Sequence, residues 1–144
     1  MVTAPLRVLV IDDEPIVGDI VSRSLALTGN VVVATTFADG CREVAAGEFD
    51  AIVCDLNLPD GDALAFASFL GQRCPHLAGR LVVTTGGALT AAHQRFLDSM
   101  EPRVLSKPFA APTVRQLVAS VVPQARLATR DRRRVESTRP PSGP

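Results

Sequence analysis

The sequence predicts an α/β fold in which five βα units build a parallel five-stranded sheet. Short runs of Val, Ile and Leu alternate with longer stretches in which apolar residues recur at helical spacing, and Gly, Pro, Asp and Asn mark the boundaries. The short runs are continuously apolar, which is typical of strands covered by helices on both faces. A chain of 144 residues, 47% of them hydrophobic, has room for one such domain and a tail.

Five apolar runs are the expected strands. They are Leu6–Ile11, Val31–Thr35, Ala51–Asp55, Leu81–Thr85 and Arg103–Ser106. The segments between and after them carry the helical pattern and give Ile16–Leu27, Phe37–Ala46, Asp62–Leu70, Leu89–Met100 and Pro112–Val122 as helices. Gly29 and Gly47 follow the first two helices, where glycine commonly ends a helix, and Pro112 suits the first turn of the fifth.

Two helices show their buried face clearly. The inward residues expected in the first helix are Ile16, Val17, Ile20, Val21, Ser24 and Leu25, and those in the fourth are Leu89, Phe96, Leu97 and Met100. Because these positions repeat every three or four residues, they form one stripe along each helix.

The charges divide the chain into a domain at 5–124 and a basic tail at 125–144. Residues 1–125 have a net charge of −4 and residues 126–144 one of +4. The tail is rich in Arg, Pro and Ser and lacks apolar periodicity, so we expect it to be disordered. Without interleaved aromatic residues, it favours a solvated linker or docking arm over a nucleic-acid site.

Several classes of protein are excluded by composition. The sequence has no apolar stretch of membrane-helix length and no secretory signal, so we expect a soluble cytoplasmic protein. Cys41, Cys54 and Cys74 are odd in number and include no CxxC pair, which argues against a disulfide framework and a zinc site.

Polar residues follow four of the predicted strands. Because parallel strands all end at the same edge of a sheet, these residues are expected to meet there, where open α/β sheets bind their ligands. They are Asp12, Asp13 and Glu14 after the first strand, Asp55 and Asn57 at the third, Thr85 and Gly86 at the fourth, and Lys107 and Pro108 at the fifth.

The carboxylates predict a site for a hard cation. Three carboxylates at one edge repel one another, and a bound Mg²⁺ would relieve that repulsion. The competing interpretation is that Asp12 or Asp13 only caps the following helix. Asp55 is a candidate nucleophile towards a phosphoryl group, although a lone Asp beside a turn is also an ordinary loop residue.

The other polar residues at this edge are suited to binding an anion, such as a phosphoryl group, next to the cation. Lys107, the only lysine in the chain, is a candidate partner for a carboxylate and for phosphoryl oxygens, although a lysine is more often a surface residue. Thr85 has a hydroxyl to donate but is also a normal strand residue. Gly86 leaves space beside it, and the Lys107–Pro108 bond is a candidate for the cis form.

With these motifs in this order, residues from about Leu6 to Val122 resemble the receiver domain of two-component response regulators. The resemblance implies a doubly wound, flavodoxin-like sheet with strand order 2-1-3-4-5. It implies Mg²⁺ bound by Asp13, Asp55 and the backbone carbonyl of Asn57, with Asp12 acting through water. It also implies that Asp55 is the phosphoacceptor and that Thr85 and Lys107 bind the phosphoryl oxygens.

The sequence departs from the family pattern at one switch position and has a narrower resemblance to one group of receivers. Val104 stands three positions before Lys107, where many receivers have an aromatic switch residue. Thr85-Gly86-Gly87, Gln94-Arg95-Phe96-Leu97 and Lys107-Pro108-Phe109 look most like receivers associated with hybrid histidine kinases.

The expected function is therefore a single-domain response regulator and not an enzyme beyond its own phosphotransfer and slow autodephosphorylation. The implied partners are a histidine kinase or histidine phosphotransfer protein, a downstream protein, and a second copy through the face of the fourth helix, fifth strand and fifth helix. Two alternatives stay open: a phosphorylation-independent adaptor, and an aspartate-nucleophile phosphatase. The phosphatase fits less well because Asn57 stands where a general acid-base Asp is needed.

Overall fold

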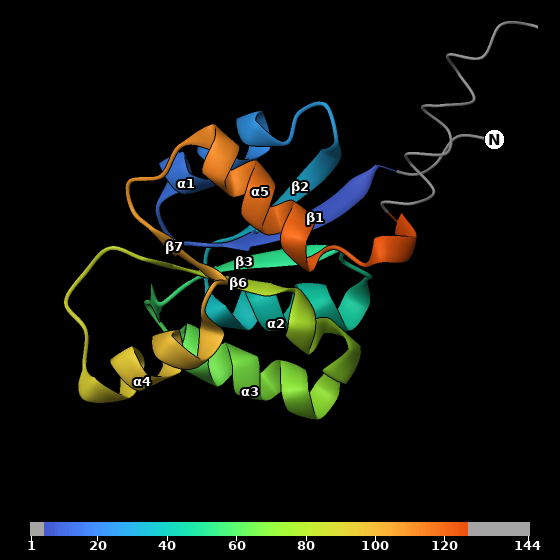
Figure 1. Cartoon of the computed structure of the whole chain (residues 1–144). Coiled ribbons are helices and arrows are strands. Elements are labelled where there is room, and N and C mark those ends of the chain that lie inside the picture. Colours follow the sequence, from blue (N-terminus) through green and yellow to red (C-terminus); the bar gives the residue numbers. More distant parts are fainter. Residues whose placement is uncertain (1–4, 127–144) are drawn as a thin grey trace, which may run out of the picture.

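A five-stranded parallel sheet forms the centre of the molecule (Figure 1). The computed structural model describes residues 5–126. The strands are β1 (Leu6–Ile11), β2 (Gly29–Ala34), β3 (Ala51–Asp55), β6 (Leu81–Thr85) and β7 (Val104–Ser106). They lie in the order β2-β1-β3-β6-β7, and every neighbouring pair is parallel. Counted by βα units this order is 2-1-3-4-5, so the predicted topology is confirmed.

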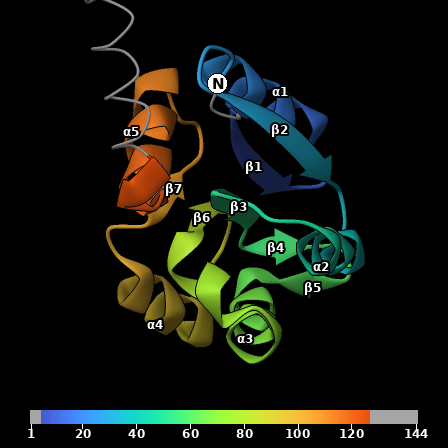
Figure 2. The same cartoon turned by 90° about the vertical axis from the view of Figure 1, so that its right-hand side faces the viewer.

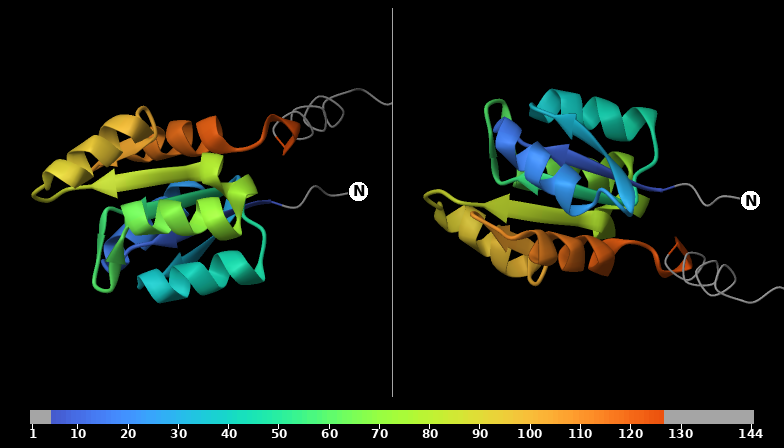
Figure 3. Two further views of the ribbon diagram at one scale, coloured as in Figure 1. Left: turned by 90° about the horizontal axis from the view of Figure 1, so that it is seen from below. Right: turned by 90° about the horizontal axis from the view of Figure 1, so that it is seen from above.

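Helices cover both faces of the sheet (Figures 1 and 3). α1 (Pro15–Ser24) and α5 (Ala111–Val121) lie on one face, and α2 (Phe37–Ala46), α3 (Ala63–Arg73) and α4 (Ala91–Met100) lie on the other. A 3₁₀ helix, η1 (Pro75–Arg80), follows α3. β4 (Asn57–Leu58) and β5 (Gly61–Asp62) form a separate antiparallel hairpin after β3.

The central strands divide their side chains between two cores. In β1, Val8 and Val10 pack with α1 and α5, whereas Leu9 and Ile11 pack with α2, α3 and α4. All four side chains are completely buried. Because successive side chains of a strand point to opposite faces, a sheet covered on both faces needs apolar residues at every position. This is why the strands appear in the sequence as continuous apolar runs.

The first and fourth helices are shorter than the sequence predicts. α1 ends at Ser24, because the N–H groups of Thr28 and Gly29 turn back to the carbonyl of Leu25. α4 begins at Ala91, since the hydroxyl of Thr90 caps it by accepting from the N–H of His93. Leu89 is therefore a loop residue.

Two residues expected in the core are exposed. The side chain of Ile16 is 62% exposed and that of Leu89 is 40% exposed, so the prediction that they face inward is wrong. Both lie at the start of a predicted helix, beside the polar edge of the sheet, where the periodicity of the helix does not decide what covers the first turn.

The predicted bounds of β1, β3, β6 and α2 are confirmed without a shift, and the remaining boundaries move by one to three residues. Asp62 is the N-cap of α3 and not its first residue, since its Oδ1 accepts from the N–H of Ala65 at 2.7 Å. The β4–β5 hairpin is absent from the prediction because each of its strands has only two residues. Cys41, Cys54 and Cys74 are free thiols.

The two ends of the described chain meet at the opposite edge of the sheet from the predicted site. Nε of Arg126 lies 3.0 Å from Oδ1 of Asp50, and its Nη2 donates to the carbonyl of Pro5 at 3.2 Å. The rest of the predicted tail, with its predicted disorder, lies outside the described residues. Within residues 5–126, no helix has both the length and the apolar character needed to cross a membrane.

The core under α2 and α3 gives a direct test of this packing. Phe66 is completely buried, with its ring edge-on to Phe37 and stacked on Phe69. We expect Phe66→Ala to lower the free energy of unfolding by about 3–5 kcal/mol, because it leaves a cavity. Urea unfolding followed by circular dichroism measures this change.

Leu64→Ala is the matched control in the same helix. Leu64 is 40% exposed, so its truncation should cost less than about 1 kcal/mol. Equal losses in the two variants would contradict the assigned burial.

Candidate functional site

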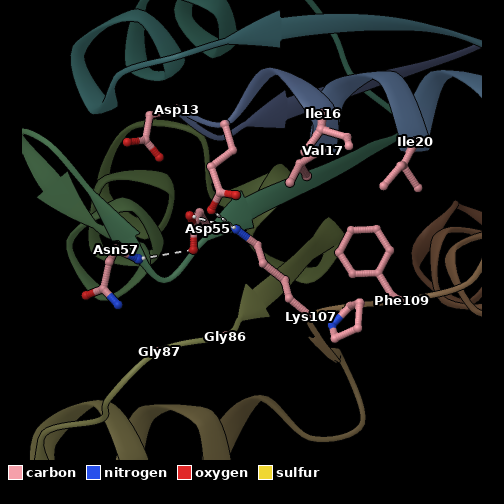
Figure 4. A pocket seen from close by; sticks show the side chains of 12 residues that line it. Asp13, Ile16, Val17, Ile20, Asp55, Asn57, Gly86, Gly87, Lys107 and Phe109 are labelled. Carbon is pink, nitrogen blue, oxygen red and sulfur yellow. Dashed lines mark hydrogen bonds and ion pairs between the residues drawn. The ribbon is translucent and has the colours of Figure 1, made fainter.

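A pocket of about 600 Å³ opens where β1, β3, β6 and β7 end (Figure 4). Its polar wall comes from the loops that follow these strands, and its apolar wall comes from the first turns of α1 and the loop before α5. The lining residues are Asp13, Glu14, Ile16, Val17, Ile20, Asp55, Asn57, Gly86, Gly87, Lys107, Pro108 and Phe109. The four strand ends named in the sequence analysis therefore do meet.

Four carboxylates lie together at one end of this pocket. One carboxylate oxygen from each of Asp12, Asp13, Glu14 and Asp55 falls within 4.8 Å of those of the others. Asp12 and Asp55 are buried, whereas Asp13 and Glu14 are exposed. Oxygen donors at this spacing are the ligands that Mg²⁺ prefers. The residues present therefore fit a hard divalent cation.

Lys107 reaches into the carboxylate cluster with its ammonium group. Nζ lies 2.9 Å from Oδ2 of Asp12, 3.1 Å from Oδ2 of Asp55 and 3.2 Å from Oε1 of Glu14. The side chain of Lys107 is 17% exposed, so these ion pairs form in a partly dehydrated setting. One ammonium faces four carboxylates, which leaves an excess of negative charge for a cation to offset.

The pKa values of Asp55 and Lys107 are both raised, but for different reasons. Burial raises the pKa of the Asp55 carboxyl above its usual value, and the hydrogen bond from Lys107 offsets only part of this. Burial lowers the pKa of Lys107, but the carboxylates of Asp12 and Asp55 outweigh burial and raise it. Lys107 is therefore a permanent cation, while ionised Asp55 is held at a cost in free energy.

Backbone groups complete the surroundings of the two buried carboxylates. The N–H of Asn57 donates to Oδ1 of Asp55 at 3.4 Å, which is marked in Figure 4. The N–H of Glu14 donates to Oδ1 of Asp12 at 2.9 Å. Asp12 thus fixes the backbone just before α1, while its other oxygen faces Lys107. The N-cap of α1 is Glu14 and no side chain caps this helix, so the interpretation of Asp12 or Asp13 as a helix cap is wrong.

The β6 and β7 ends supply shape as well as polar groups. The carbonyl of Thr85 accepts from the N–H of Lys107 at 2.8 Å, while the Thr85 side chain is not among those lining the pocket. A Cβ at Gly86 would lie 3.0 Å from Cβ of Lys107, so glycine allows the lysine stem to pass. The Lys107–Pro108 bond is cis. Val104 is partly buried and packs against the core under α4.

Glu14 stands in the acidic run expected at this edge, but the sequence assigns it no role in the site. Its carboxylate contacts Lys107. The signal was present in the run Asp12-Asp13-Glu14, but a sequence does not show which of three consecutive acidic side chains turns towards a distant lysine.

An apolar rim adjoins the charged cluster. We use this term for the pocket-lining residues Ile16, Val17, Ile20, Pro108 and Phe109. Figure 4 shows Ile16, Val17, Ile20 and Phe109 on the side of Asp55 away from Asp13 and Asn57. Ile16, which is 62% exposed, and Pro108 are the exposed residues of this rim. A polar centre with an exposed apolar rim is suited to a macromolecular partner that must reach the centre.

Comparison with known proteins agrees with this geometry. The family model for the response regulator receiver domain matches residues 8–119. The swarming motility regulation protein RssB of Serratia marcescens is 31% identical over 121 residues, which are 81% of this chain and 52% of RssB. The chain spans about half or less of the length of the curated relatives that it matches.

Solved structures show the same fold. The chemotaxis response regulator CheY4 of Vibrio cholerae superimposes with a TM-score of 0.66 at 19% identity, over 83% of this chain and all of CheY4. The beryllofluoride-activated receiver domain of NtrC4, a dimer, gives a TM-score of 0.69 at 24% identity, over 81% of this chain and 95% of that domain.

The raised pKa of Asp55 leads to a prediction about stability. Since the folded state disfavours the ionised carboxyl, the contribution of Asp55 to stability falls as the pH rises through its raised pKa. Asp39 and Asp60, whose pKa values are lowered, contribute in the opposite sense, so the comparison is made between variants and not on wild type alone. At pH 7 without divalent cations, Asp55→Asn should therefore be more stable than wild type, by about 0.5–2 kcal/mol. The gain should disappear below pH 4, where Asp55 is protonated in both states. Urea unfolding across this pH range measures it.

Asp98→Asn controls for the loss of one negative charge. Asp98 is exposed on α4, so this variant should change stability by less than about 0.5 kcal/mol. An Asp55→Asn variant that is less stable than wild type at pH 7 would contradict the assigned cost of the buried carboxylate.

Proposed function

The chain belongs to the response regulator receiver domain family, and on that premise we propose that Asp55 accepts a phosphoryl group from a histidine kinase or a histidine phosphotransfer protein. The observation that carries the proposal is the position of Asp55. Its carboxylate is 10% exposed, contacts Nζ of Lys107 at 3.1 Å and opens into the pocket. A nearly buried nucleophile beside a fixed cation is suited to a substrate with negatively charged oxygens.

The proposed step transfers the phosphoryl group from nitrogen to oxygen. An Asp55 oxygen attacks phosphorus, the P–N bond to the donor histidine breaks, and the imidazole leaves with the electron pair and takes up a proton. Lys107 is placed to contact the phosphoryl oxygens as the charge on Asp55 increases. The N–H of Asn57 orients the carboxylate through Oδ1. Thr85 is proposed to donate its hydroxyl to the same oxygens, over the space beside Gly86.

Mg²⁺ is the proposed cofactor. Asp13, Asp55 and the carbonyl of Asn57 would hold it directly, and Asp12 would act through water. When bound, the ion supplies positive charge that lets the anionic carboxylate and the phosphoryl group approach each other. The four-carboxylate cluster supports this assignment, since Lys107 alone offsets only one of the four charges.

The proposed output is a change of protein-binding surface and not turnover of a substrate. Besides its own phosphorylation and slow autodephosphorylation, no reaction is assigned to the domain. With a histidine kinase as the proposed donor, the proposed location is the cytoplasm. The face formed by α4, β7 and α5 is the proposed surface for a second copy, and a downstream protein is the proposed receiver of the signal. The relation to hybrid kinases stays a prediction.

The apolar rim is the proposed docking surface of the phosphohistidine donor. It lies on the same pocket as Asp55, so a helical partner covering Ile16 and Phe109 would bring its histidine to the carboxylate. The rim would thereby provide specificity for the donor while the charged cluster performs the transfer.

Intact mass spectrometry tests the acceptor assignment. Incubation of wild type with Mg²⁺ and acetyl phosphate should add one phosphoryl group, and removal of Mg²⁺ with a chelator should reduce the adduct at least tenfold. Asp55→Asn should form no adduct, whereas Asp98→Asn should behave as wild type. If no donor gives an adduct in wild type, the domain is a phosphorylation-independent adaptor; steady release of phosphate from small esters would instead support the phosphatase alternative.

The rim is tested by comparing two donors. Ile16→Gln should slow transfer at least tenfold from a phosphorylated histidine kinase selected from a panel for activity on wild type, since an interface residue of this kind is worth about 1.4 kcal/mol or more. Labelling by acetyl phosphate should change less than twofold.

Leu27→Gln is the control, because Leu27 is 97% exposed and does not line the pocket. Equal kinase rates for Ile16→Gln and wild type would rule out docking through the rim.

A further inference from the structure

α4 is joined to the rest of the domain by one notable polar contact. Nε2 of His93, in the first turn of α4, lies 3.1 Å from Oδ2 of Asp62. The His93 side chain is only 14% exposed. Within residues 5–126 this is the only hydrogen bond or ion pair between a side chain of α4 and an element that precedes β6. Otherwise α4 is held by its buried apolar residues, such as Phe96 and Leu97.

The imidazole is attached through a single ring atom. Nδ1 of His93 is buried and has no hydrogen-bond partner. Because Nε2 faces a carboxylate, Nε2 carries the proton and donates it, whatever the charge of the ring. A displacement of Asp62 by about 1 Å would therefore break the only polar attachment of the ring.

Asp62 places this contact on the hairpin that follows Asp55. Its other oxygen, Oδ1, caps α3 through the N–H of Ala65 at 2.7 Å. Asp62 is also the partner of Asn57 in the β4–β5 pairing, and the N–H of Asn57 donates to Asp55. A continuous series of contacts thus runs from the carboxylate of Asp55 through the hairpin to His93.

The opposite side of the hairpin is held more firmly. Oδ1 and Oδ2 of Asp60 accept from the N–H groups of Phe37 and Ala38, at the start of α2, at 2.7 and 3.0 Å. A Cβ at Gly61 would lie 2.8 Å from the ring of Phe37, so the hairpin fits closely against α2, beside which it lies in Figure 2. The contacts with α2 therefore oppose a movement of the hairpin towards or away from α2. A movement on the side of α4 has only the contact with His93 to change.

The direct connection from β6 to α4 is loose by comparison. It runs through Gly86 and Gly87, and a Cβ at Gly87 would meet nothing within 4 Å. Leu89, in the same loop, is 40% exposed. Val104 offers no large ring between this loop and the surface of α4. The loop alone is thus poorly built to transmit a displacement from the site to α4.

We propose that the contact between His93 and Asp62 couples phosphorylation of Asp55 to the position of α4. This inference rests on the proposed function, because it assigns the route by which the modified site changes the binding surface. His93 is a positioning residue here: it touches neither Asp55 nor the pocket. Coupling through a discrete contact of this kind needs two arrangements of one element, and α4 is that element.

NMR spectroscopy of the ¹⁵N-labelled chain tests the coupling, with beryllofluoride and Mg²⁺ as the phosphoryl mimic. In wild type, the mimic should shift the amide signals of Asn57 and Gly86 near the site and those of residues 91–100 in α4. In His93→Ala the shifts near the site should persist, while those in α4 should fall to less than half. His93→Gln, which keeps an amide donor, should restore most of the α4 response.

The other histidine is the matched control. His76 also faces a carboxylate, Glu48, at 3.3 Å, but the pair is exposed and belongs to η1. His76→Ala should respond as wild type. A full α4 response in His93→Ala would overturn the proposal, and so would a lost response in both His93→Ala and His93→Gln with local shifts intact. Absence of any shift in wild type would instead overturn the proposed function.

If His93→Ala fails to fold, Asp62→Ser, which keeps a cap for α3, replaces it with the same expected outcomes.

Discussion

The repulsion between carboxylates at the edge of the sheet is the constraint on which the site depends. A parallel sheet brings the ends of β1, β3, β6 and β7 to one edge, and the sequence puts acidic residues at the first two and lysine at the last. Lys107 contacts three carboxylates, but its single charge leaves the cluster strongly negative. The apolar strands behind the cluster prevent it from relaxing, because moving a buried carboxylate would open the core. Such a site is poised for a cation and for an incoming anion bound to it.

The fold connects the excess negative charge of the site to helices on the surface of the domain. The loops that carry the charged groups continue into the helices that cover the sheet, and the β4–β5 hairpin lies between Asp55 and the first turn of α4. The hairpin is fixed to α2 by Asp60 and joined to α4 by His93. In the proposed coupling, a change of charge at Asp55 acts on α4 through this hairpin. The apolar rim on the other side of the pocket stays available to a donor. In the proposed function, the surface that would contact the phosphodonor and the surface that would change in response are thus separate parts of this edge.

Much of this could be predicted from the sequence, because strands buried on both faces leave an unambiguous pattern. The five strands and the convergence of Asp12, Asp55 and Lys107 follow from apolar runs and from the geometry of parallel sheets, whereas the strand order comes only from the resemblance to receiver domains. What could not be predicted depends on tertiary contacts. Ile16 has the right helical phase for the core but lies beside the open pocket. Local periodicity does not predict contacts between segments that are far apart in the chain. The contacts of Glu14 with Lys107 and of His93 with Asp62 are of this kind.

Calorimetric titration of Mg²⁺ into the metal-free protein tests most directly the claim that the carboxylate cluster is built for a cation. One Mg²⁺ should bind per chain, with an affinity that falls at least tenfold in Asp13→Asn and is unchanged in Asp50→Asn, whose carboxylate is paired with Arg126 at the opposite edge of the sheet. A protein that binds no Mg²⁺ at tens of millimolar, or binds it equally well without the Asp13 carboxylate, would contradict the account.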